Sequence, residues 1–303
     1  MSASTRRRFL AISAAAVATP ICAAAAETRV HHWRGAALGA AASITLNGTD
    51  AATAARIVDA GVAEIARLER IFSLHRDDSA LARLNRDGRL DAPPFELLEL
   101  LGICADVHDR TGGAFDPTVQ PLWALHAERH AAGAPPSPAE IEQVLERTGW
   151  RHLRFDSASV SFDRAGMALT LNGIAQGYIA DRVAMRLRDA GLRDVLVDMG
   201  EIAAFGARPG GGPWRVGIAG GARRDLSDAA IATSAPLGTT LDAAGTAGHI
   251  LDPRTGHPGG RWRQVTVIAR SAALADGFST GFCLMPEARI EAVAGLLDVL
   301  LVA

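Results

Sequence analysis

Segments with helical and strand-like patterns follow one another irregularly along this 303-residue chain, and this irregularity constrains the fold most. Apolar residues recur at helical spacing in 50–71 and 95–111, whereas 39–46, 195–197 and 264–269 are short apolar runs typical of strands. The order shows no regular β-α-β succession, and no Gly-x-Gly-x-x-Gly follows a strand. The sequence therefore predicts an α+β fold with mixed or antiparallel sheets and packed helices, and not a Rossmann fold.

The same patterns assign the remaining elements. Helices are expected at 138–147, 173–187, 271–285 and 286–297, strands at 214–218, 229–233 and 299–302, and short β pieces within 151–171, the last of them at 168–171. A Gly/Pro-rich surface segment is expected at 131–138. No internal repeat is visible, so we expect one large domain or two closely packed lobes.

The N-terminus has the pattern of an export signal. Residues 5–10 carry three consecutive arginines and precede an apolar, Ala-rich run that ends at Ala26, which is typical of a twin-arginine signal peptide. We therefore expect residues 1–26 to be removed and residues 27–303 to form a periplasmic domain without a membrane span. Lipidation at Cys22 is the alternative, although the residue before it fits that signal poorly.

Composition excludes several kinds of chemistry. All 31 basic residues are arginine, because the chain contains no lysine, and the formal net charge is −2. Schiff-base catalysis, a Walker A loop and a lysine general base are therefore excluded, and no basic face points to nucleic acid. Phosphate charge can be neutralised only by metal, arginine or backbone N–H groups. Cys104 and Cys283 lie in apolar segments and are expected as buried free thiols, with a single disulfide as the alternative.

A carboxylate and a hydroxyl share one face of the helix expected at 271–285. Asp276 and Thr280 are four residues apart, and with one carbonyl from elsewhere they would form a partial oxygen shell for Mg²⁺. His249, beside a Pro/Gly-rich turn, has an ordinary pKa suited to proton transfer, which together with a metal suggests phosphoryl chemistry. The alternatives are a solvated Asp, a Thr bonded to its own helix and a turn histidine. His257 is the less favoured proton acceptor.

Two further segments carry polar or small residues of interest. Residues 171–177 join a strand to a helix through small residues, so the helix N-terminus could receive a pyrophosphate; an ordinary tight turn is the alternative. His126 and His130 superficially resemble a zinc-binding helix, but the glutamate is misplaced for His-Glu-x-x-His, so we expect a solvated helix face there.

Six ordered motifs resemble one known family. They are Phe72-Ser73 with Asp78-Ser79 and Leu84-Asn85, Thr111 to Pro117, Asn172 to Tyr178, Ala232-Thr233-Ser234, His249 to Gly256, and Ala275-Asp276 with Thr280. Together they closely resemble the ApbE-type FAD:protein FMN transferases over roughly residues 35–300. Those enzymes move FMN from FAD onto a Thr or Ser hydroxyl of a partner flavoprotein and release AMP. The resemblance implies a two-lobed fold with FAD in a cleft between the lobes.

The resemblance also implies roles for individual residues. Asp276, Thr280 and the Gly173 carbonyl would bind Mg²⁺ or Mn²⁺, and His249 would be catalytic. Glu201 would be an acidic partner. The expected FAD contacts are Leu38, His75, Ala114, Phe115, Asp116, Gln176, Thr233, Ser234 and Ile250. For Phe115 core burial is an equal alternative, and for Thr233 and Ser234 turn capping is.

The sequence departs from the family pattern at three positions. Thr170 stands where the family typically has Asp, Gln176 often corresponds to Lys, and Met199 replaces a glycine. The last two variants resemble the branch associated with nitrous-oxide reductase maturation. The departures keep two alternatives open: a periplasmic FAD carrier without turnover and a Mg²⁺-dependent FAD pyrophosphatase. The expected partner is an exported or membrane-bound flavoprotein, whose identity the sequence does not give.

Overall fold

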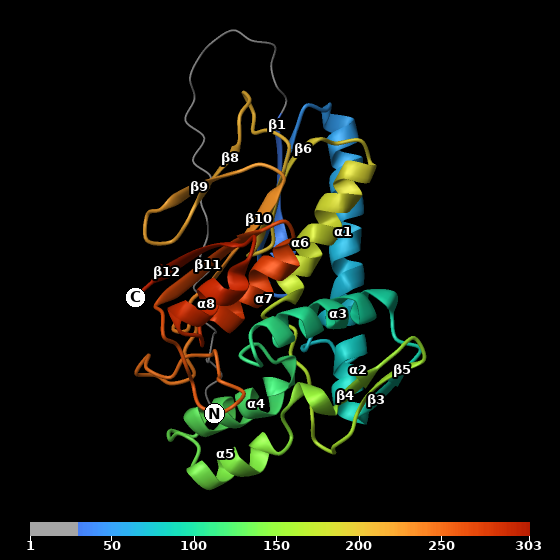
Figure 1. The fold of residues 1–303 in the computed structure, drawn as a ribbon. Helices are drawn as coiled ribbons and strands as arrows, with labels where there is room; N and C mark the ends of the chain where they lie inside the picture. The colour runs from blue at the N-terminus through green and yellow to red at the C-terminus, as the bar shows by residue number, and fades with distance from the viewer. Residues whose placement is uncertain (1–29) are drawn as a thin grey trace.

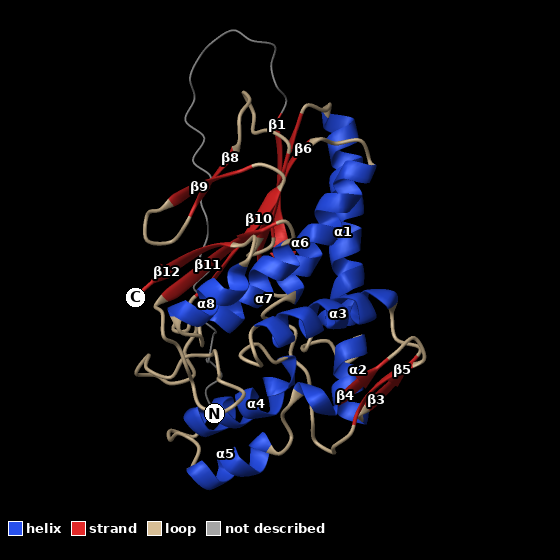
Figure 2. Ribbon diagram, viewed as in Figure 1, coloured by secondary structure: helices blue, strands red, loops and turns tan. Residues whose placement is uncertain are grey.

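The computed structural model describes residues 30–303 and shows a large antiparallel sheet with helices packed against it (Figures 1 and 2). The expected signal peptide, 1–26, and Cys22 lie outside the described residues. Across 30–303 no helix has the length and apolar character needed to cross a membrane. The helices are α1 (Ala51–Phe72), α2 (Ala80–Asp87), α3 (Phe95–Arg110), α4 (Gln120–Ala131), α5 (Pro138–Leu145), α6 (Ala175–Asp189), α7 (Ala272–Phe282) and α8 (Glu287–Ala294).

The main sheet has seven strands in the order β1-β2-β6-β7-β10-β11-β12, and every neighbouring pair is antiparallel. The strands are β1 (Val30–Ala37), β2 (Ala40–Asn47), β6 (Asp194–Asp198), β7 (Ile202–Phe205), β10 (Ala229–Ser234), β11 (Gln264–Ala269) and β12 (Asp298–Val302). This arrangement confirms the expected α+β class with antiparallel sheets and without a Rossmann topology.

Alternating side chains on the sheet build two separate cores. In β6, Val195 and Val197 face the helices α1, α6 and α7, whereas Leu196 joins a second cluster on the opposite face. That second cluster includes Trp214 and Leu226 from the hairpin formed by β8 (Trp214–Gly217) and β9 (Arg223–Leu226). The strand period of two therefore sends successive residues into different cores.

A smaller body lies beyond the C-terminal end of α1 (Figure 2). It contains a three-stranded antiparallel sheet in the order β3-β5-β4, together with α2 and the pair α4 and α5. The strands are β3 (Arg89–Asp91), β4 (Leu153–Phe155) and β5 (Ser159–Phe162). Helix α1 contacts α2 of this body, and α3 packs on both α1 and α7.

Helix α7 lies at the centre of the molecule, in contact with β10, β11, α6 and α3. Its N-terminus is capped from α6: Asp181 accepts hydrogen bonds from the Ala272 and Ala273 amides at 2.8 and 3.0 Å. The helices α6 and α7 touch closely at Gly177, where an added Cβ would lie 2.2 Å from the Ala272 carbonyl oxygen. The packing therefore fixes the position of α7 relative to α6.

We expect Gly177→Ala to lower the free energy of unfolding by about 2 kcal/mol or more, because α6 and α7 must separate to admit the methyl group. The matched control is Gly102→Ala in α3, where an added Cβ meets nothing within 4 Å. That change should raise stability by about 0.5–1 kcal/mol through the lower flexibility of the unfolded chain. Urea unfolding of both variants measures the difference, and equal effects would contradict the packing argument.

Most expected elements are confirmed within a few residues, including the helices at 50–71, 95–111 and 173–187. The strand expected at 168–171 is wrong. There the Asn85 side chain takes the place of a neighbouring strand: its amide donates to the Leu169 carbonyl at 2.8 Å and accepts from the Leu169 N–H at 2.7 Å. The sequence patterns also missed β1, α2, β3, β7 and β9.

Candidate active site

Three segments distant in sequence meet around the middle of α7. Ser234, the last residue of β10, lies with its Oγ 2.7 Å from Ser279 Oγ and 3.3 Å from Thr280 Oγ1. On the other side, Thr280 Oγ1 lies 3.5 Å from the carbonyl oxygen of Gly173. The structure therefore brings Thr280, Ser234 and Gly173 together.

Asp276 faces the start of α6. One carboxylate oxygen accepts a hydrogen bond from the Gly177 N–H at 3.2 Å, and only 4% of the residue is exposed. Burial raises the pKa of Asp276 to about 7, opposed by the Gly177 hydrogen bond and helped by the Asp181 carboxylate. The side chain therefore points into the protein near the 171–177 turn, and the expectation of a solvated Asp is excluded.

Further carboxylates surround Asp276. Burial, and next the Asp276 charge, raise the pKa of Glu201 well above its usual value, and burial also raises the pKa values of Asp198 and Asp181. Within residues 30–303, none of these four carboxylates has an arginine within ion-pair distance. Asp276 is buried and the other three are partly buried. Acids removed from water without a positive partner are unfavourable, so the region is suited to a cation.

The donor set fits a hard divalent cation that keeps other ligands. Across residues 30–303, no three His, Cys, Asp or Glu side chains gather closely enough to hold a metal alone. One carboxylate, one hydroxyl and one carbonyl, from Asp276, Thr280 and Gly173, form only part of a shell. Mg²⁺ suits such a site because it prefers oxygen ligands and usually retains waters and substrate phosphates.

The close approach of Thr280 leaves little room for a side chain at position 173. An added Cβ at Gly173 would lie 3.0 Å from Thr280 Oγ1 and 3.2 Å from its methyl group. The turn is closed by the Ala175 N–H, which donates to the Leu171 carbonyl at 2.7 Å, and α6 starts directly after it. The Ala175 and Gly177 N–H groups are bonded within the protein, so among the described residues the Gln176 N–H is the one in the first turn left to attract a negatively charged group.

His249 lies in the loop that follows β10. Its Nδ1 is 3.0 Å from the Thr239 carbonyl oxygen and 3.2 Å from that of Pro236. Carbonyl oxygens only accept, so Nδ1 carries the proton and Nε2 has a free lone pair. Burial lowers the pKa of His249, so the ring is neutral at neutral pH. The Pro236 carbonyl that holds His249 is only two residues after Ser234. The Cα atoms of Pro236 and Ser234 are therefore at most about 7 Å apart.

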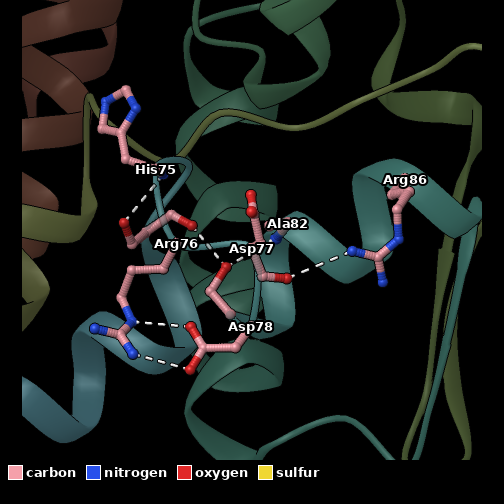
Figure 3. A network of polar contacts seen from close by, with 8 residues as sticks. His75, Arg76, Asp77, Asp78, Ala82 and Arg86 are labelled. Atoms are coloured by element: carbon pink, nitrogen blue, oxygen red, sulfur yellow. Dashed lines mark hydrogen bonds and ion pairs between the residues drawn. The ribbon is translucent and has the colours of Figure 1, made fainter.

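Two expected flavin contacts lie on turns at the edge of the main body. Leu38 is partly buried and has a φ of +48°, a conformation rare outside glycine, and its N–H donates to Glu69 at 2.8 Å. His75 is exposed on a loop fixed by bidentate pairing of Arg76 with Asp78 and by Arg86 donating to the Asp77 carbonyl (Figure 3). The His75 ring points away from the Arg76–Asp78 pair.

The expected contacts at 114–116 are buried. Phe115 is 5% exposed within the main core, as its alternative interpretation held. The Asp116 carboxylate supports the local backbone: it accepts from the Thr118 N–H at 2.8 Å and from the Trp150 N–H at 3.0 Å. The Asp116 side chain is therefore occupied within the scaffold. Ala114 is also buried.

Of the other expected FAD contacts, Gln176 and Thr233 are hydrogen-bonded within the protein. Gln176 donates to the Met199 carbonyl at 3.0 Å, linking the start of α6 to the 199–201 turn. Thr233 Oγ1 lies 2.9 Å from Thr266 Oγ1, and its N–H donates to Glu201 at 3.3 Å. Ile250 is buried, and Thr170 donates its N–H to the Pro117 carbonyl.

The solvated face expected around His126 is wrong. His126 is 2% exposed, and its Nε2 lies 2.8 Å from the Gly256 carbonyl oxygen. The contact spans 130 residues, so local sequence gave no sign of it. Sequence reasoning also missed Asp181, whose capping of α7 is equally long-range. Cys104 and Cys283 are buried free thiols, as expected.

Comparisons with known proteins all point to one family. A model described as the ApbE family matches residues 38–301. The FAD:protein FMN transferase of Vibrio cholerae serotype O1 is 32% identical over 241 residues, which cover 74% of this chain and 71% of the relative. The FAD:protein FMN transferase of Escherichia coli K12 is 28% identical over 287 residues, covering 88% and 82%.

Solved structures share the whole fold. Flavin transferase ApbE from Vibrio cholerae superposes with a TM-score of 0.78 at 28% identity, covering 90% of this chain and 93% of that chain. The apo form of Pseudomonas stutzeri flavinyl transferase ApbE gives 0.78 at 27% identity, covering 90% and 92%. The ApbE protein from Thermotoga maritima gives 0.80 at 26% identity, covering 90% and 94%.

Proposed function

The chain belongs to the ApbE family, and on that premise we propose that this flavin transferase moves FMN from FAD to a Thr or Ser hydroxyl of a partner flavoprotein, releasing AMP in a Mg²⁺-dependent reaction. The observation that carries the proposal is that two side chains of α7 contact the start of α6: Asp276 accepts from the Gly177 N–H, and Thr280 lies beside the Gly173 carbonyl. These groups give a phosphate-binding helix start and cation-binding oxygens in one place.

The reaction exchanges one P–O bond for another. The acceptor hydroxyl oxygen bonds to the FMN phosphorus of FAD, and the bond from that phosphorus to the bridging oxygen breaks, so that oxygen leaves with AMP. The free Nε2 of His249 takes the hydroxyl proton, because Nδ1–H is held by the Thr239 and Pro236 carbonyls. That pairing also fixes the ring orientation.

Asp276, Thr280 and the Gly173 carbonyl would hold Mg²⁺, or Mn²⁺, which have the same preference for oxygen ligands. When bound, the ion neutralises negative charge on the phosphate oxygens. The Gln176 N–H and the positive end of the α6 dipole contribute in the same sense, and the chain's own role is to position these groups before the reaction. Ser234, bonded to Thr280 and Ser279, keeps the Thr280 hydroxyl oriented.

We also propose that the protein acts in the periplasm after removal of residues 1–26, and that residues 27–303 form the transferase domain. The arginine-containing leader sequence supports export by the twin-arginine route. The acceptor would then be an exported or membrane-bound flavoprotein that exposes a Thr or Ser.

The test incubates the mature protein with FAD, Mg²⁺ and a flavoprotein acceptor, and follows covalent flavin on the acceptor and free AMP. We expect both products in equal amounts. Acceptor-independent AMP would identify a pyrophosphatase, and FAD binding without either product would identify a carrier; each result would contradict the transferase.

Removal of the metal is a separate prediction. Excess EDTA should reduce transfer to background, because the charge on the phosphates is then opposed only by N–H groups. Added Mg²⁺ or Mn²⁺ should restore transfer, and Ca²⁺ is the comparison ion because it prefers more ligands at longer distances. Full activity in EDTA would contradict the metal assignment.

A further inference from the structure

A buried histidine outside the proposed site contacts the loop that carries His249. His126 projects from α4, and its Nε2 lies 2.8 Å from the Gly256 carbonyl oxygen. Carbonyls only accept hydrogen bonds, so Nε2 carries the proton. His126 is 2% exposed. The contact is therefore a buried hydrogen bond between the smaller body and the loop.

The loop from His249 to Gly259 is closed on itself. The Gly259 N–H donates to the Ile250 carbonyl at 2.9 Å, and Leu251 pairs with Pro258. At the tip, the Gly256 N–H donates to the Asp252 carbonyl at 2.8 Å. These bonds join the two limbs of the loop, so a displacement at its tip is transmitted to its base, where His249 lies.

The tip of the loop is inserted between α4 and α5. Gly256 has a φ of +75°, and an added Cβ would lie 2.4 Å from Ile141 of α5 and 3.1 Å from Leu122 of α4. Leu251 packs in the same cluster with these two residues. This apolar packing holds the tip in place. The His126 hydrogen bond is directional, so it also fixes the orientation of the tip, which apolar contacts do not.

The second ring nitrogen of His126 is buried with no hydrogen-bond partner among residues 30–303. A buried polar atom without a partner is destabilising, so an apolar side chain would pack more favourably at this position. The titratable neighbours are His130, whose ring stacks on His126, and His257 from the loop; Arg129 and Glu140 pair with each other nearby. Retaining a histidine here is explained by the Gly256 bond.

We propose that His126 is a positioning residue for His249, acting through the 249–259 loop, an inference that rests on the proposed transferase function. His126 touches neither the carboxylates around Asp276 nor the His249 ring in the described contacts. Its effect is to hold the loop in one place so that His249 Nε2 stays in register with the reacting hydroxyl. A misplacement of about 1 Å can lower a rate by about 100-fold.

The test compares His126→Leu, which removes the donor, with His126→Gln, which keeps an N–H near the Nε2 position. For His126→Leu we expect kcat for transfer to fall by about 10- to 100-fold, while the Kd of FAD changes less than about twofold. His126→Gln should recover at least half of the lost activity on a logarithmic scale. The control is His130→Ala, which loses the stacked ring but no bond to the loop and should keep the original kcat.

Hydrogen exchange provides a readout that does not depend on activity. In His126→Leu, amides of residues 250–259 should exchange at least tenfold faster, whereas those of α7 should not change. Equal kcat and equal exchange in the original protein and His126→Leu would overturn the inference. So would a loss of kcat fully explained by a smaller folded fraction. If the original protein shows no transfer, the proposed function fails, and the exchange result still decides whether His126 holds the loop.

Discussion

Replacing Asp276 with Asn will reduce flavin transfer by about 10³-fold or more, yet leave the metal-free protein at least as stable as the original. Transfer falls because the only carboxylate in the proposed cation shell loses its charge. Stability is kept because the Asp276 carboxylate is buried without an arginine partner, and burial raises its pKa. A folded-state pKa above the unfolded value means that the ionised form destabilises the fold at neutral pH.

Two measurements test the expected loss of transfer and the expected retention or gain of stability. Thermal unfolding in EDTA should give an equal or higher Tm for Asp276→Asn, and added Mg²⁺ should raise the Tm of the original protein alone. The control is Asp59→Asn, an exposed residue of α1, which should change neither property. Transfer above a tenth of the original rate in Asp276→Asn would show that the carboxylate does not serve the reaction.

Replacing His249 with Gln will lower kcat for transfer by about 10²- to 10⁴-fold, the usual contribution of a general base. The affinities for FAD and Mg²⁺ should change little, because the proposed cation ligands are on other segments. His257→Gln is the control: it is exposed on the same loop, and its loop hydrogen bonds are made by its backbone N–H and carbonyl. An equal loss of kcat in His257→Gln would indicate that His257, and not His249, is the general base.

The pH dependence of transfer should reflect the titration of His249. The ring must be neutral to accept a proton, and burial lowers its pKa from the ordinary 6.5. At saturating Mg²⁺, which favours the ionised form of Asp276, transfer should therefore rise with pH through a value below 6.5 and be level at pH 7 and above. In His249→Gln this acidic limb should disappear; its persistence would assign the limb to another group.

Long periodic segments made the helices predictable from sequence. Residues 50–71 place Ile57, Ile65 and Leu68 on one buried face, and a regular pattern of this length is hard to mistake. The strand expected at 168–171 came from a real alternation, since Leu169 and Leu171 are buried. It failed because Asn85, far away in sequence, supplies the hydrogen bonds of a missing neighbour. The alternation correctly predicted which residues are buried. It could not show that a side chain, and not a neighbouring strand, takes their backbone hydrogen bonds.

The candidate site was predictable to the extent that its spacing is local. Asp276 and Thr280 are one helical turn apart, so their shared face followed from sequence, and the family motifs supplied Gly173 and His249. The family resemblance supplied Glu201 as well, but Asp181 and Asp198 did not follow from sequence, because these carboxylates converge only in the folded chain. His126 was misjudged for the same reason.

The close packing of α7 limits how this part of the sequence can vary. Ala272, Ala273 and Ala275 are buried, and an added Cβ at Gly281 would lie 2.9 Å from Thr111 of the neighbouring segment. A larger residue at these positions would push the helix away from a neighbour on one side or another. Natural variation along α7 should therefore exchange one small residue for another, and bulkier substitutions should accumulate on the exposed surfaces of α5 and α8.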